Sequence, residues 1–247
     1  MVSLVFLLCI IQLVLVLVLL VYLPRSQPHS RINNPILVIS TPFSNIPVAL
    51  LLCTVNTEER RSMYEDVILW WLDQKPVFDL FIVDSTTNSF HPRIESQCRI
   101  CHFDQTSVPN YESIKNNTTE LEIIALQHAQ DHFALQWTSY TYVVKLTGKY
   151  KLPTLYTTLK RVIKDDSTDL FVQSIHFKDW QNTELFVFKP LLFQNMLNVL
   201  NMLEKIYMEI RLYTAIKLGA LGPYNRLPVL QNVATYKRQV GNILPHL

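Results

Sequence analysis

Continuous apolar runs alternate with amphipathic segments along most of this chain, and the pattern indicates an α/β fold. Residues 48–55 and 78–83 are apolar almost throughout, as expected for strands that are buried on both faces of a sheet. Residues 57–74 place apolar side chains at helical spacing, and Pro76 follows them. A strand, a helix and a strand in this order predict a parallel β-α-β unit.

The same alternation continues towards the C-terminus. In chain order we expect an irregular segment over 90–117, a helix over 119–135, a strand over 140–144, a helix over 154–164, strands over 169–173 and 183–188, a helical region over 190–218 that is broken near Glu204, and short strands over 225–230 and 233–236. The first of these helices is expected to open with a capping box in Thr119-Glu-Leu-Glu122.

The N-terminus differs from the rest of the chain, because Val2–Leu23 is a stretch of 22 residues without charge. As a helix it would be about 33 Å long, enough to span the hydrocarbon core of a bilayer. It is longer than the apolar region of a cleaved signal peptide and lacks a small-residue cleavage site. We therefore predict a transmembrane signal-anchor over 1–24, a stem rich in Pro, Ser and Asn over 25–46, and a folded domain over 47–247.

Two signals disagree about the side of the membrane on which the folded domain lies. Arg25 and Arg31 follow the apolar stretch, and the positive-inside rule would place the domain in the cytosol. Asn116 and Asn117 begin overlapping N-glycosylation sequons, which favour a lumenal domain. A single-pass membrane protein is expected in both cases.

Composition argues against several classes of function. The net charge of +2 gives no electrostatic signal for nucleic-acid binding. With 4 glycines and 13 prolines, the chain does not suggest a glycine-rich phosphate loop. Cys98 and Cys101 form a single C-x-x-C motif, which by itself is weak evidence for zinc. A disulfide in a lumenal domain and unpaired thiols are both open for these cysteines.

The stretch Tyr140–Pro153 is the strongest candidate for a ligand site. A β-rich apolar run leads into Gly148, and Lys145, Lys149 and Lys151 surround this glycine. A buried strand followed by such a turn can bring backbone N–H groups and lysines to one place, where an α/β protein usually binds an anion. The alternative is an ordinary strand end with solvated lysines.

The order of elements resembles a glycosyltransferase of the GT-A type. More narrowly, Val144–Tyr150 resembles the K-[IL]-T-G-[RK]-Y motif of a set of glycosyltransferase-like membrane proteins, and so do Asn182–Phe186, Met208–Tyr213 and Arg226–Pro228. The resemblance implies a GT-A-like (Rossmann-like) mixed sheet flanked by helices. It also implies a nucleotide-sugar donor, a glycan or glycoprotein acceptor, and a lumenal domain in the Golgi or endoplasmic reticulum.

The resemblance assigns provisional roles to the residues at the strand ends. Asp84, at the end of the second strand, would hold the nucleoside. The residues expected at the donor and its phosphates are Asp84, Lys145, Thr147, Gly148, Lys149 and Tyr150. The place of a metal-binding D-x-D motif contains no carboxylate, which argues against dependence on a divalent metal. Lysines and turn N–H groups would then stabilise the leaving phosphate.

Glu209 is the first candidate for the catalytic base, because it lies near the end of an apolar helical run, and Glu184 is the second. The competing interpretation of Glu209 is a surface residue paired with Lys205. Two further hypotheses for the whole chain are a non-catalytic anchored domain that binds a glycan or a partner, and an anchored scaffold that faces the cytosol.

Overall fold

The computed structural model describes residues 47–54, 58–74, 78–164, 167–173, 180–203, 207–228 and 230. The predicted anchor, the predicted stem and the predicted strand over 233–236 lie outside these residues. Within the described ranges, no helix is both long and apolar enough to cross a membrane.

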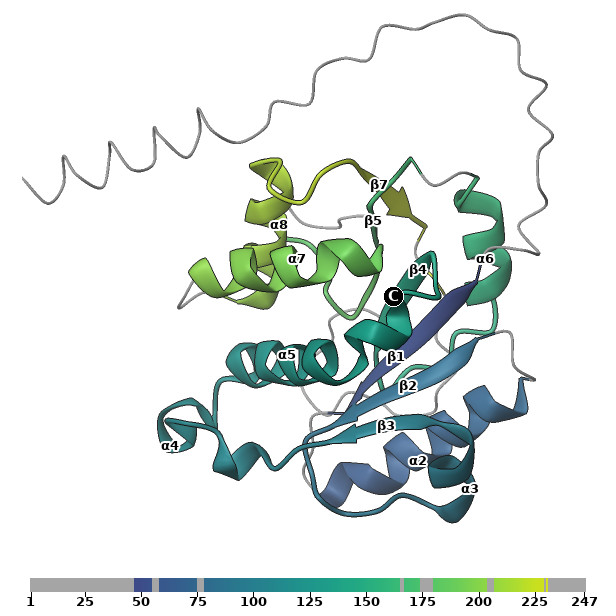
Figure 1. Cartoon of the computed structure of the whole chain (residues 1–247), viewed down its shortest axis with the longest axis vertical. Helices are drawn as coiled ribbons and strands as arrows, with labels where there is room; N and C mark the ends of the chain where they lie inside the picture. Colours follow the sequence, from purple (N-terminus) through teal and green to yellow (C-terminus); the bar gives the residue numbers. More distant parts are fainter. Residues whose placement is uncertain are drawn as a thin grey trace, which may run out of the picture. The chain divides into compact units, whose positions relative to one another are not determined.

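Seven strands form one mixed sheet in the order β3-β2-β1-β4-β6-β5-β7 (Figure 1). Their bounds are β1 Val48–Thr54, β2 Asp79–Asp84, β3 Arg99–His102, β4 Tyr142–Thr147, β5 Leu170–Gln173, β6 Leu185–Phe188 and β7 Tyr224–Leu227. The ladders of β1 with β2 and β4, of β2 with β3, and of β5 with β7 are parallel. β6 is antiparallel to both β4 and β5. The predicted α/β fold with a mixed, Rossmann-like sheet is confirmed.

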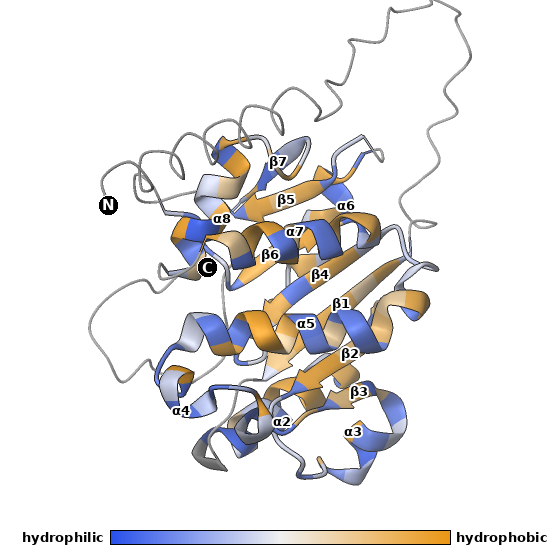
Figure 2. Ribbon diagram, turned by 60° about the vertical axis from the view of Figure 1, so that its left-hand side comes forward, coloured by the Kyte–Doolittle hydropathy of each residue, from blue (hydrophilic) through white to orange (hydrophobic). Residues whose placement is uncertain are grey.

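Helices cover both faces of the sheet (Figures 1 and 2). One face carries α2 Glu58–Asp73, α3 Pro92–Gln97 and α6 Leu155–Val162, and the other carries α5 Thr118–Trp137, α7 Pro190–Met202 and α8 Met208–Lys217. Two short helices, η2 Gln105–Ser107 and α4 Tyr111–Ile114, precede α5. Leu51 and Cys53 of β1 pack towards α5, whereas Leu50 and Leu52 pack towards α2. This two-sided burial explains the continuous apolar run of β1.

The segment over 90–117 was wrongly expected to be irregular. It contains α3, β3, η2 and α4. β3 has only four residues, and its burial ranges from exposed at Arg99 to buried at Cys101, so it lacks the continuous apolar run of the inner strands. α3 begins with Pro92, which suits the first turn of a helix because proline lacks an N–H.

The start of α5 also differs from the expected capping box. Oδ1 of Asn117 accepts hydrogen bonds from the N–H groups of Thr119 (3.1 Å) and Glu120 (3.3 Å), so Asn117 is the N-cap. Asparagine is the stronger capping residue. The Thr119 hydroxyl is used elsewhere, because it accepts a hydrogen bond from the Met208 N–H of α8 (3.2 Å).

Candidate functional site

The candidate site lies where the order of strands reverses. The chain proceeds from β1 through β2 to β3 on one side, and then returns to place β4 on the other side of β1. Ligands of open α/β sheets commonly bind beyond the carboxyl ends of the strands at such a switch point. β4 ends at this edge with the predicted Thr147, and the predicted Gly148, Lys149 and Tyr150 follow it.

Gly148 packs directly against β1. Its N–H donates to the Cys53 carbonyl oxygen (2.9 Å). A Cβ at this position would lie 2.7 Å from Cγ2 of Thr54 and 3.2 Å from Cδ1 of Tyr64. The N–H of Thr147 likewise donates to the Glu184 carbonyl oxygen (2.9 Å). The prediction that turn N–H groups bind an anion is therefore wrong for these two residues, because both groups hold the ends of neighbouring strands together.

Lys145 is buried rather than presented to a ligand. Its ammonium pairs with Glu122 of α5 and donates to the Thr183 carbonyl oxygen at 2.6 Å and to Oγ1 of Thr147 at 3.4 Å. Burial acts to lower the pKa of Lys145, but Glu122 and the other nearby acidic groups raise it overall. An ammonium has three N–H donors, and three protein acceptors occupy them here. Lys145 therefore stays charged and joins α5 to β4 and to the residues before β6.

Lys149 and Glu184 form an ion pair at the edge of the sheet. Lys149 Nζ lies 3.1 Å from Oε1 of Glu184 and 5.0 Å from the centre of the Tyr150 ring. Burial acts to raise the pKa of Glu184, but Lys149, hydrogen bonding by Tyr150 and the charge of Lys145 lower it overall. Oε2 of Glu184 is buried and accepts no hydrogen bond from any described residue. Glu184 is therefore an ionised carboxylate with one vacant acceptor position.

Glu209 lies in the first turn of α8 and is half-buried. Burial raises the pKa of its carboxyl, and the negative charges of Glu122 and Glu184 add to this effect. The N–H of Gln181 donates to the Glu209 carbonyl oxygen at 3.3 Å, which connects α8 to the segment before β6. Glu209 therefore lies within electrostatic reach of Glu184, the other predicted catalytic carboxylate. Lys205 lies outside the described residues.

Asp84 is fully buried at the end of β2. Its carboxylate accepts hydrogen bonds from the Thr54 hydroxyl (2.7 Å), from the Thr86 hydroxyl (2.6 Å) and from the Thr86 N–H (3.2 Å). Nδ1 of His102 lies 3.2 Å from the same carboxylate. Binding of a nucleoside by Asp84 would require an exchange of one of these protein contacts.

Sequence reasoning missed two contributors to the site. Glu122 was expected in the capping box of a helix, and Tyr64 lies in the helix expected over 57–74, where no role in a site was predicted for it. Tyr64 is buried against Gly148, and burial raises the pKa of its hydroxyl, with Arg60 acting in the opposite direction. The sequence contains no signal for the contact between Glu122 and Lys145, because it depends on how α5 lies across β4.

The described cysteines form neither the zinc site nor the disulfide considered above, and Cys9 lies outside the described residues. Cys53, Cys98 and Cys101 are all unpaired thiols. Burial raises the pKa of Cys98 to about 12 and also raises that of Cys101. In the described part of the chain, no three His, Cys, Asp or Glu side chains come together in a group that could hold a metal ion.

No family model matches this chain, and no curated protein sequence matches it. Among solved structures, a glycosyltransferase involved in the glycosylation of the major capsid of PBCV-1 is similar at 9% identity and a TM-score of 0.45, over 73% of this chain and 82% of that one. A cytidylyltransferase from Leptospira borgpetersenii serovar Hardjo-bovis is similar at 10% identity and a TM-score of 0.46, over 74% of this chain and 76% of that one. CMP:2-keto-3-deoxy-manno-octonic acid synthetase complexed with CTP is similar at 8% identity and a TM-score of 0.43, over 76% of this chain and 93% of that one. Similarity at this level does not bear on the activity of this chain.

Proposed function

We propose that this chain is a glycosyltransferase that uses a nucleotide-sugar donor and transfers the sugar to a glycan or glycoprotein acceptor. The observation that supports the proposal most is a pair of carboxylates at the switch point with opposite pKa shifts. The pKa of Glu184 is lowered, and that of Glu209 is raised. Two carboxyl groups whose pKa values are shifted in opposite directions are typical of sites in which one carboxyl exchanges protons and the other stays ionised.

Glu209 is the proposed general base. A raised pKa brings a carboxylate closer to neutrality and makes it a better proton acceptor. In the proposed step Glu209 takes the proton of an acceptor hydroxyl. The hydroxyl oxygen forms the new bond to the sugar carbon, and the bond from that carbon to the nucleotide phosphate breaks. The leaving phosphate keeps the electron pair.

Lys149 is the proposed partner of the leaving phosphate. Its side chain is 29% exposed, so a ligand can reach the ammonium, whereas Lys145 is fully buried. Glu184 positions Lys149 through their ion pair of 3.1 Å. Because the segment from Lys145 to Lys149 has no carboxylate, the lysine takes the place in which a D-x-D motif would hold a metal.

Titration calorimetry with UDP-, GDP- and CMP-sugars, with and without manganese, tests donor binding directly. We expect one class of donor to bind to the wild-type chain and to bind at least tenfold more weakly to Lys149→Met. Lys151→Met is the matched control, because Lys151 pairs with Asp66 of α2 (2.7 Å) and not with Glu184. If no sugar nucleotide binds in either condition, the glycosyltransferase proposal fails.

A second candidate is a non-catalytic domain of the same fold that binds a glycan or a partner. The observation in its favour is that Asp84, Lys145 and the N–H groups of Thr147 and Gly148 are all engaged with protein groups. This candidate predicts glycan binding without donor binding. A glycan array probed with the wild-type chain, together with the same calorimetric panel, separates the two candidates.

A further inference from the structure

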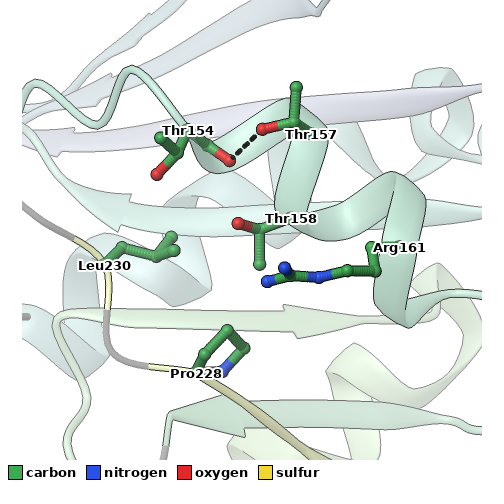
Figure 3. A pocket seen from close by; sticks show the side chains of 6 residues that line it. All are labelled: Thr154, Thr157, Thr158, Arg161, Pro228 and Leu230. Carbon is green, nitrogen blue, oxygen red and sulfur yellow. Dashed lines mark hydrogen bonds between the residues drawn. The ribbon is translucent and has the colours of Figure 1, made fainter.

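A separate cavity lies between α6 and the residues that follow β7 (Figure 3). Its volume is about 290 Å³. The lining residues are Thr154, Thr157, Thr158, Arg161, Pro228 and Leu230. None of them belongs to the site that contains Lys149, Glu184 and Glu209, so the cavity is not explained by the proposed function.

The first observation concerns the Thr158 side chain, which lines this cavity. Thr158 is only 5% exposed, yet its hydroxyl has no hydrogen-bond partner among the described residues. A helical threonine often donates to the carbonyl four residues earlier. Here the Thr154 carbonyl already accepts from the Thr157 hydroxyl (3.0 Å) and from the Thr158 N–H (2.9 Å). The Thr158 hydroxyl is therefore left for a ligand or for water.

Two further donors border the same space. The Thr154 side chain makes no capping hydrogen bond to α6. Arg161 has no ion pair and no hydrogen bond with any described side chain, and in Figure 3 its guanidinium extends beneath Thr158. A guanidinium remains charged at all physiological pH values and presents a planar fork of donors. Pro228 and the buried Leu230 form an apolar wall of the cavity.

We propose that this cavity binds the phosphate group of a small phosphate monoester. A phosphate monoester offers three terminal oxygens, which match two free hydroxyls and the donor fork of Arg161. A carboxylate offers only two. The apolar wall suits the carbon skeleton next to the phosphate, and about 290 Å³ is near the lower limit for small-molecule sites.

Titration calorimetry of the full chain with phenyl phosphate tests this proposal. We expect binding at one site per chain, and binding at least tenfold weaker in Arg161→Gln. Lys160→Gln is the matched control, because it removes a positive charge from the same helical turn but Lys160 does not line the cavity. Its affinity should equal that of the wild-type chain. Equal affinity of wild type and Arg161→Gln, or no binding to wild type at millimolar phenyl phosphate, would overturn the proposal.

Thr158→Val provides a second variant, which does not depend on charge. Because the hydroxyl has no partner, its removal leaves no protein group unsatisfied, and the variant should fold. We expect phenyl phosphate to bind about three- to tenfold more weakly. Unchanged affinity in this variant counts against the proposed geometry.

Comparison ligands identify the chemistry and its source. Benzoate should bind more weakly than phenyl phosphate, and the reverse order would contradict the choice of phosphate. Vesicles that contain phosphatidic acid test a lipid headgroup as the source. Vesicle binding that is lost in Arg161→Gln, without binding of phenyl phosphate, would overturn the assignment to a small soluble ligand. Donor binding in the calorimetric panel is expected to be the same in Arg161→Gln and wild type, so this proposal and the glycosyltransferase proposal can fail separately.

Discussion

Replacement of Gly148 by alanine should destabilise the fold through a steric clash. Gly148 is not one of the described glycines with positive φ, so its backbone conformation is accessible to alanine. The added methyl group would lie 2.7 Å from Cγ2 of Thr54 and 3.2 Å from both the Cys53 carbonyl oxygen and Cδ1 of Tyr64. Two of these neighbours belong to a central strand and cannot move far.

The expected cost follows from two opposing effects. Overpacking of a buried site costs about 1–3 kcal/mol. The change from glycine to alanine restricts the unfolded chain and offsets about 0.4–1 kcal/mol of this loss. The midpoints of the two ranges differ by about 1.3 kcal/mol, and we therefore expect the free energy of unfolding to fall by about this amount. Chemical unfolding of the full chain, followed by tryptophan fluorescence, measures this difference.

Thr54→Ser provides a specific rescue. It removes the clashing Cγ2 and retains the hydroxyl that donates to Asp84 (2.7 Å). In the wild-type background, loss of this buried methyl group should cost about 0.8 kcal/mol. In the Gly148→Ala background it should cost nothing or restore stability. Equal effects of Thr54→Ser in the two backgrounds, or a Gly148→Ala variant as stable as wild type, would refute the steric explanation.

Three other predictions concern the ion pairs and the sequons. Lys145→Met should lower the free energy of unfolding by about 3 kcal/mol, because it leaves Glu122 without its partner. The double variant Lys145→Met, Glu122→Met should recover most of this loss. The same unfolding assay measures both variants. The folded pKa of Glu184 lies below its ordinary value of 4.5, so its stabilising effect is present above pH 4.5 and is lost as the pH falls through the lowered value. The stability difference between wild type and Glu184→Gln should therefore shrink on acidification, and a constant difference would contradict this assignment. If the domain is lumenal, endoglycosidase treatment of the chain expressed in a eukaryotic cell should reduce its apparent mass, and Asn116→Gln with Asn117→Gln should abolish the shift. Both asparagines are exposed, and an unglycosylated wild-type chain would favour the cytosolic orientation.

The inner strands could be predicted from the sequence, because burial on both faces leaves a continuous apolar run. β1, β2, β4, β5 and β6 were all expected as strands, with boundaries shifted by up to three residues, the largest shift being at the end of β4. β3 could not be predicted in this way, since it is short, exposes Arg99 and buries only Cys101 fully. The break between α7 and α8 was expected near Glu204, and α7 ends at Met202 while α8 begins at Met208.

Strand-end reasoning named residues that lie near one another but did not name their partners. Lys149 pairs with Glu184, and Glu209 lies within electrostatic reach of Glu184, whereas the roles assigned to these three residues stay predictions. Lys145 was expected to face a ligand, yet it is fully buried against Glu122. A side chain's direction along a strand depends on pleat and register, and its partner depends on the packing of a helix that is distant in sequence. Neither property is encoded in the local pattern around the motif.

The reversed direction of β6 bears on how the chain tolerates insertions and deletions. Lys149 follows β4 and Glu184 precedes β6, so the antiparallel ladder places them side by side although 35 positions separate them. The direct pairing of Leu146 with Leu185 sets their relative position, and α6 and β5 lie in the connection between the two strands. Related chains should therefore vary in length between these two strands while the ion pair keeps its geometry. Insertions within β4 or β6 themselves should separate the pair.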